Sequence, residues 1–154
     1  MNLDKAAGVL WLLAAWVASP ATQGTTGQGG RALPSSLLTR LETAVEREFR
    51  QLERTSTVRV RDVTVTPRNG GAVLAVVLAL PRDQRFEVHV ENAYARIWQA
   101  LSTQPNAYKE LGRVTLSLRR SSRQMTVECP IRAVEASRGR ADFTRLKRSC
   151  RIRR

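Results

Sequence analysis

One uninterrupted apolar stretch constrains this chain more than any other feature. Residues 72–80 read AVLAVVLAL, with Gly70 and Gly71 before them and Pro81 after them. Nine residues are too few to span a bilayer, and the valine content is typical of a strand. The stretch therefore predicts a central β-strand buried on both faces, which amphipathic segments elsewhere in the chain must cover.

A hairpin is predicted to join this strand to the one before it. Residues 57–66 alternate like a strand, and their phase changes at Arg61–Asp62, which indicates a β-bulge or a kink. The turn at residues 67–71 contains Asn69-Gly70, a strong short-range signal for a hairpin. The two strands are therefore expected to pair antiparallel.

Two amphipathic helices are predicted, one on each side of this hairpin in the sequence. The first begins near Pro34 with a serine cap, and its apolar face holds Leu38, Leu41, Val45, Phe49 and Leu52. The second covers about residues 83–102, with an apolar face of Phe86, Val90, Ala93, Tyr94, Ile97 and Leu101. Residues 86–90 also alternate as a strand would, in which case this helix begins near Asn92.

A second hairpin follows, and it completes the predicted fold. Residues 114–118 and 125–131 each alternate between apolar and polar side chains, with a turn at residues 120–123 between them. Pro130 suggests that the later strand lies at an edge. The order α-β-β-α-β-β predicts an α+β fold, a small antiparallel or mixed four-stranded sheet with two helices on one face, spanning residues 34–136.

The N-terminal segment has the composition of a secretory signal peptide, residues 1–21. Residues 6–18 form an apolar run, which is shorter than the ~20 residues of a membrane-spanning helix. Small residues at 19–21 favour cleavage after Ala21, with Gly24 as a second position. An uncleaved anchor or a buried N-terminal helix are the alternatives. Residues 22–33, rich in Gly, Thr and Gln, are predicted to be a flexible linker.

The formal net charge of +13 predicts attraction to an anionic partner: an anionic polymer, a membrane surface, an acidic protein or nucleic acid. The alternative is that an arginine-rich coding bias produced the charge. The basic residues concentrate in a predicted C-terminal tail, residues 137–154, which is either a solvated extension or a binding arm. The candidate binding residues are Arg138, Arg140, Arg145, Lys147, Arg148, Arg151, Arg153 and Arg154.

Few residues of this chain are suited to catalysis. His89 is the only histidine, so a histidine-rich metal site cannot be built, and no nucleophile motif is present. Cys129 and His89 lack a third orienting group for a nucleophile–base pair. Trp98 and Tyr94 are interpreted as core or interface residues. We expect no catalytic residues, no metal, no cofactor and no small-molecule substrate.

The two cysteines connect location to structure. In an exported chain Cys129 and Cys150 are the only thiols, and an even number in an oxidising compartment favours a disulfide. In a cytosolic chain they would be two reduced thiols. The sequence therefore predicts a non-enzymatic module of the envelope, periplasm or secreted fraction that binds an anionic partner or assembles with other proteins. The alternative is a nucleic-acid-binding protein.

Overall fold

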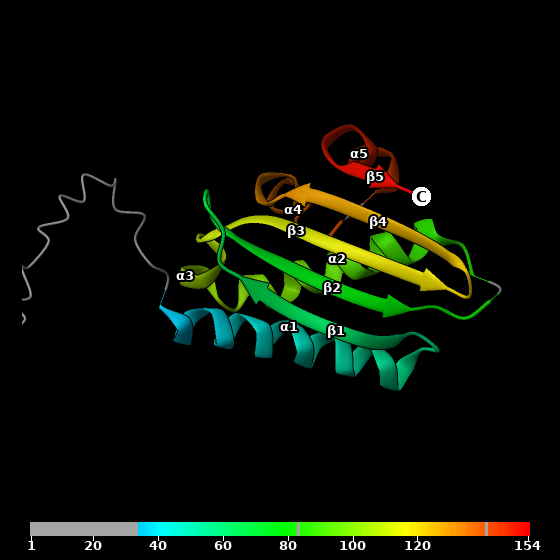
Figure 1. Cartoon of the computed structure of the whole chain (residues 1–154), viewed down its shortest axis with the longest axis horizontal. Coiled ribbons are helices and arrows are strands. Elements are labelled where there is room, and N and C mark those ends of the chain that lie inside the picture. Colours follow the sequence, from blue (N-terminus) through cyan, green and yellow to red (C-terminus); the bar gives the residue numbers. More distant parts are fainter. Residues whose placement is uncertain (1–33, 83, 141) are drawn as a thin grey trace, which may run out of the picture.

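The computed structural model describes residues 34–82, 84–140 and 142–154. It has an α+β fold, as predicted, in which helices pack against a mixed five-stranded sheet (Figure 1). The strands lie in the order β1-β2-β3-β4-β5; β2 and β3 run parallel, and the other neighbours run antiparallel. The predicted signal peptide and linker, residues 1–33, lie outside the described residues.

The elements follow one another with short connections. The helices are α1 (Ser35–Thr55), α2 (Phe86–Ser102), α3 (Pro105–Tyr108), α4 (Ile131–Ser137) and α5 (Phe143–Ser149). The strands are β1 (Arg59–Thr66), β2 (Ala72–Ala79), β3 (Leu111–Arg120), β4 (Arg123–Pro130) and β5 (Arg151–Arg153).

The first hairpin is confirmed. β1 pairs antiparallel with β2, and the register shifts between Val60 and Asp62, where the sequence predicts a bulge. Gly70 and Gly71 in the turn have φ of +89° and +113°, a backbone region that favours glycine. The change of phase in β1 therefore keeps Val60, Val63 and Val65 on one side of the sheet despite their uneven spacing.

The prediction that β2 is buried on both faces is wrong. Side chains at alternate positions are fully buried in the core, and those between them are only half-buried. The buried set is Ala72, Leu74, Val76 and Leu78. The helices pack against one face of the sheet and complete this core. In Figure 1 that face points back toward α2, and the opposite face points toward the viewer. Val73, Ala75, Val77 and Ala79 belong to that second face, which we call the open face. No helix of the described residues lies over this face in Figure 1, so an unbroken apolar run need not mean two covered faces.

Helix α1 lies along β1 and closes that edge of the sheet (Figure 1). Its stripe of Leu41, Val45 and Phe49 is buried as predicted. Two of its acidic side chains reach the strand. The carboxylate of Glu42 accepts a hydrogen bond from the main-chain N–H of Val65 (2.9 Å), and that of Glu53 accepts one from the N–H of Val60 (2.7 Å). The predicted serine cap is wrong, because Pro34 occupies the N-cap and no side chain caps the helix.

Helix α2 begins at Phe86, which decides between the two interpretations of residues 86–90 in favour of a helix. Its buried face contains Val90, Ala93, Tyr94, Ile97 and Leu101, as the spacing predicts. The helix packs in the core behind the sheet and connects β2 to β3 (Figure 1). Such a crossover is what two parallel neighbouring strands require.

The predicted tail, residues 137–154, is folded onto the domain rather than extended from it. Helix α5 buries Phe143 and Leu146 in the core, and β5 pairs antiparallel with β4 from Thr126 to Glu128. The sheet therefore has a fifth strand, and β4 is not the edge strand that Pro130 suggested. The apolar spacing of Phe143 and Leu146, together with a bond through Cys150, outweighs the high charge of this segment.

Candidate anion-binding site

A disulfide between Cys129 and Cys150 holds the C-terminal segment against β4. The Cα atoms lie 4.4 Å apart, and Cys129 is fully buried on the core side of β4. Cys150 immediately precedes β5, so the bridge fixes where that strand begins. The bond predicted from the count of cysteines is present, and it carries the last basic residues of the chain to defined positions.

The predicted anion-binding residues do not gather in one place. Arg140, Arg145 and Arg148 line a pocket of about 350 Å³ between α4 and α5, the α4–α5 pocket. Arg151 and Arg153 lie on the open face, and Arg154 lies on the opposite side of β5. Arg138 is a left-handed residue that ends α4, and the Lys147 ammonium lies 4.9 Å from the ring of Phe143. Because residues 137–154 form the end of α4, the helix α5 and the strand β5, their basic side chains lie in different parts of the surface.

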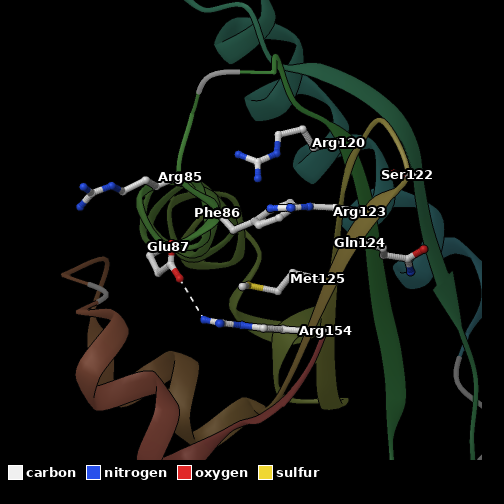
Figure 2. Close-up of a pocket in the computed structure, with 9 residues that line it drawn as sticks. All are labelled: Arg85, Phe86, Glu87, Arg120, Ser122, Arg123, Gln124, Met125 and Arg154. Atoms are coloured by element: carbon white, nitrogen blue, oxygen red, sulfur yellow. Dashed lines mark hydrogen bonds and ion pairs between the residues drawn. The ribbon is translucent and has the colours of Figure 1, made fainter.

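A second pocket, at the start of α2, brings Arg154 together with basic residues from other elements. We call it the α2 pocket; its volume is about 490 Å³, within the range of small-ligand sites. Figure 2 shows its lining side chains, which come from the start of α2, the β3–β4 hairpin and the C-terminal residue. They are Arg85, Phe86, Glu87, Arg120, Ser122, Arg123, Gln124, Met125 and Arg154.

The β3–β4 hairpin explains why Arg120 and Arg123 enter this pocket together. They are register partners across the hairpin, so both side chains leave the sheet on the same side. That side is the core side, because Leu118 and Met125 are the neighbouring partners and both are buried. Beyond the end of the core, the two guanidinium groups extend toward α2 in Figure 2, whereas Gln124 points to the other face.

Contacts hold two of the arginines in place. The guanidinium carbon of Arg120 lies 4.6 Å from the centre of the Phe86 ring, and Nη1 donates a hydrogen bond to the main-chain oxygen of Gln84. Arg154 donates to the carboxylate of Glu87 at 3.0 Å, an ion pair drawn in Figure 2. Arg123 has no ion pair among the described residues. The pocket thus contains a guanidinium that is free to take a ligand between two that are already oriented.

The pocket is electropositive. Its lining contains the four arginines at positions 85, 120, 123 and 154 against one acid, Glu87. The first turn of α2 adds partial positive charge, since no side chain caps its free N–H groups. The α4–α5 pocket is less strongly positive, because its lining contains three arginines and one acid, Asp142, whose carboxylate accepts a hydrogen bond from the N–H of Thr144 (2.8 Å).

Sequence reasoning missed the arginines of the hairpin. The sequence predicts a turn at residues 120–123, and its positive charge is densest in the C-terminal segment, so it points to that segment as the basic site. The signal was nevertheless present: Arg120 continues the alternation of Val114, Leu116 and Leu118, so it belongs to the core-facing set. A basic residue at the end of a buried strand face is directed toward whatever packs beside that face.

The side chains suited to catalysis are otherwise engaged or buried. Cys129 is bonded to Cys150 and offers no thiol. His89 is buried on α2, burial lowers its pKa, and its Nε2 has no hydrogen-bond partner. The other buried polar group, Glu48, faces Arg96 at 3.8 Å, and neither residue lines the α2 pocket.

Two features of membrane and metal proteins are missing from the part of the chain that the structure describes. None of its helices is long and apolar enough to cross a membrane. None of its groups of His, Cys, Asp and Glu is placed to hold a metal ion.

In comparisons with known proteins, no family model, no curated protein and no solved structure matches this chain.

Proposed function

We propose that this protein is an exported, non-enzymatic module that binds an anionic partner, and that the α2 pocket is the centre of binding. The observation that carries the proposal is the convergence of Arg120, Arg123 and Arg154 on one pocket from separate segments of the chain. Arginines repel one another, so several that line one cavity are stabilised when an anion shares them.

The guanidinium group suits such a role because its planar fork donates parallel hydrogen bonds to an oxyanion. Glu87 neutralises one arginine of the pocket, which leaves an excess of positive charge for a ligand. The partner would be an anionic polymer, a membrane surface or an acidic patch on another protein. The pocket lies at the molecular surface between a hairpin and a helix start, where a group projecting from a large partner can enter (Figure 2).

Export is supported by two independent features. The disulfide is typical of proteins that mature in an oxidising compartment. The apolar run at residues 6–18, with small residues after it, favours a signal peptide removed near Ala21. N-terminal sequencing of the protein purified from its natural host tests this directly: we expect the mature chain to begin at Thr22, and an intact Met1 would argue against export.

Matched charge-removal variants test the binding site. We expect Arg120→Ala/Arg123→Ala to elute from immobilised heparin at clearly lower salt than the wild-type protein. The control is Arg119→Ala/Arg153→Ala, which removes the same charge from the open face of the same sheet, on β3 and β5. Elution of the two variants at the same salt concentration would mean that only net charge matters, and the α2 pocket would no longer be the proposed site.

A nucleic acid is the alternative partner, and the open face supports it. That face carries exposed arginines from three strands, β1, β3 and β5: Arg59, Arg113, Arg119, Arg151 and Arg153. Their charge is partly compensated, since Arg113 is paired with Glu128. If DNA binds there, the dependence of affinity on salt should become shallower by about one phosphate contact per arginine removed in the open-face variant. The pocket variant would then retain the wild-type slope.

A further inference from the structure

We propose that the ligand group of the α2 pocket is a phosphate monoester. This inference rests on the proposed function and names the chemistry of the anion. It follows from the number of guanidinium groups that converge, from the acid placed beside them and from the apolar floor of the pocket. The open face also has a pocket, but that pocket brings together two arginines, Arg68 and Arg113, with one acid, Glu128.

The number of arginines favours a phosphate monoester over other anions. Arg120, Arg123 and Arg154 offer three forks to one cavity. A phosphate monoester has three terminal oxygens and a charge of about −1.5 to −2 at neutral pH, so each fork can meet an oxygen. A carboxylate offers two oxygens and one charge, and a phosphodiester also carries one charge. The monoester is therefore the anion that satisfies this set most completely.

Glu87 acts in this arrangement as an internal counter-ion. Its carboxylate already binds Arg154 at 3.0 Å, at the edge of the pocket. An incoming phosphate has to share Arg154 with that carboxylate, and the like charges of phosphate and Glu87 oppose binding. The ion pair is largely solvent-exposed, and exposed pairs contribute little, so its removal should strengthen binding modestly. Glu87 would thus keep the affinity low enough for the ligand to be released.

The floor of the pocket indicates that the phosphate is carried by an organic group. Phe86 is half-buried beside the guanidinium of Arg120, and Met125 lies beneath it in Figure 2. Met125 is itself buried, so the apolar surface that meets water is that of Phe86, which inorganic phosphate would leave exposed and the carbon chain of a monoester can cover. A soluble sugar or glycerol phosphate and the headgroup of a lipid such as phosphatidic acid present the same chemistry.

Titration calorimetry at low salt with glycerol 3-phosphate tests the inference on the full mature protein. We expect saturable binding with one site, and a loss of about tenfold or more in affinity for Arg123→Ala, the value for losing one charged hydrogen bond. Arg123 has no ion pair in the described structure, so this substitution should leave folding intact. Glu87→Gln should bind about two- to fivefold more tightly, because it keeps the shape and removes the charge.

Two adjacent arginines, Arg153 at the end of β5 and Arg154 directly after it, provide a control in which each variant loses the same charge. Arg153→Ala should bind like the wild-type protein because Arg153 lies on the open face, whereas Arg154→Ala should lose affinity. Equal losses in these two variants, or tighter binding of inorganic sulfate than of glycerol 3-phosphate, would overturn the assignment of a phosphate monoester.

Vesicle binding separates the two sources of the ligand. Flotation with vesicles of phosphatidic acid, compared at equal surface charge with phosphatidylglycerol, distinguishes a monoester headgroup from a diester. Binding to phosphatidic acid that depends on Arg123 identifies a lipid source, and binding only to glycerol 3-phosphate identifies a soluble one. If neither binds, while the heparin experiment still separates the pocket variant from its control, the phosphate inference fails and the broader proposal stands.

Discussion

The phenol of Tyr94, in the middle of α2, donates a hydrogen bond to the main-chain oxygen of Val127 on β4 at 3.1 Å. A second carbonyl oxygen, that of Val114 on β3, lies 3.4 Å from the same hydroxyl. Tyr94 is completely buried, and burial raises its pKa, with a smaller contribution from the charge of Glu128. One polar atom in the core therefore fixes the helix over the junction of two strands.

Replacement of Tyr94 by Phe should lower the free energy of unfolding by about 1 kcal/mol, the net contribution of one buried hydrogen bond. The ring and its packing remain, so the variant should fold. Urea unfolding followed by circular dichroism provides the measurement, and an unchanged midpoint would mean that the hydrogen bond contributes nothing to stability.

Val76→Asp should abolish cooperative folding. Val76 has no exposed surface, and its register partners Val63 and Leu116 belong to the same core, so a carboxylate there would be buried without a partner. The loss of several kcal/mol that this implies is comparable to the stability of a small domain. Val77→Asp is the control, because Val77 points to the open face and is half-buried. A cooperative thermal transition for Val76→Asp would contradict the assignment of the core face.

The mature protein should contain no free thiol. Intact mass after alkylation without reduction should show no adduct, because Cys129 and Cys150 are its only cysteines and are bonded to each other. Cys129→Ser/Cys150→Ser should lower the stability by about 3 kcal/mol, the chain-entropy value for a loop of this size. Two adducts on the unreduced protein would remove both the bond and one of the reasons for proposing export.

The stability of this protein should decrease as the pH falls below about 6.5, the ordinary pKa of histidine. Burial lowers the pKa of His89 in the folded state, so the unfolded chain takes up a proton first and unfolding becomes easier. The stability that neutral His89 contributes is fully present above the pKa of histidine in the unfolded chain. It is lost as the pH falls toward the lower pKa of His89 in the folded protein. His89→Leu should therefore flatten the melting temperature between about pH 7.5 and pH 5.5, because His89 is the only histidine. Equal slopes for both proteins would contradict this.

Local patterns predicted the parts of the fold that local contacts determine. The Asn69-Gly70 turn, the bulge at Arg61–Asp62 and the apolar stripe of α2 are each decided by residues close in sequence. The neighbours of β2 could not be derived in the same way, because β3 pairs with it in parallel from the far side of a helical crossover. Alternation within a strand cannot say which strand lies beside it.

The C-terminal segment shows a second limit of the sequence. Its charge predicted an extension, but Phe143, Leu146 and the disulfide fold it onto β4, and this distributes the predicted binding residues over three regions. The α2 pocket forms only because the hairpin, the helix start and the last residue meet in space. A site assembled from such distant segments has no compact motif, so composition can indicate an anionic partner without locating where it binds.

The carboxylates of Glu42 and Glu53 on α1 also limit how copies of this chain can join. They accept hydrogen bonds from two main-chain N–H groups of β1 that could otherwise pair with a strand of another molecule. Among the described residues, the edge without such side-chain contacts is β5, which is three residues long and bears Arg151 and Arg153 on its open-face side. A short edge strand that carries charged side chains is itself a poor template for another strand, so both edges of this sheet disfavour the stacking of copies into fibres.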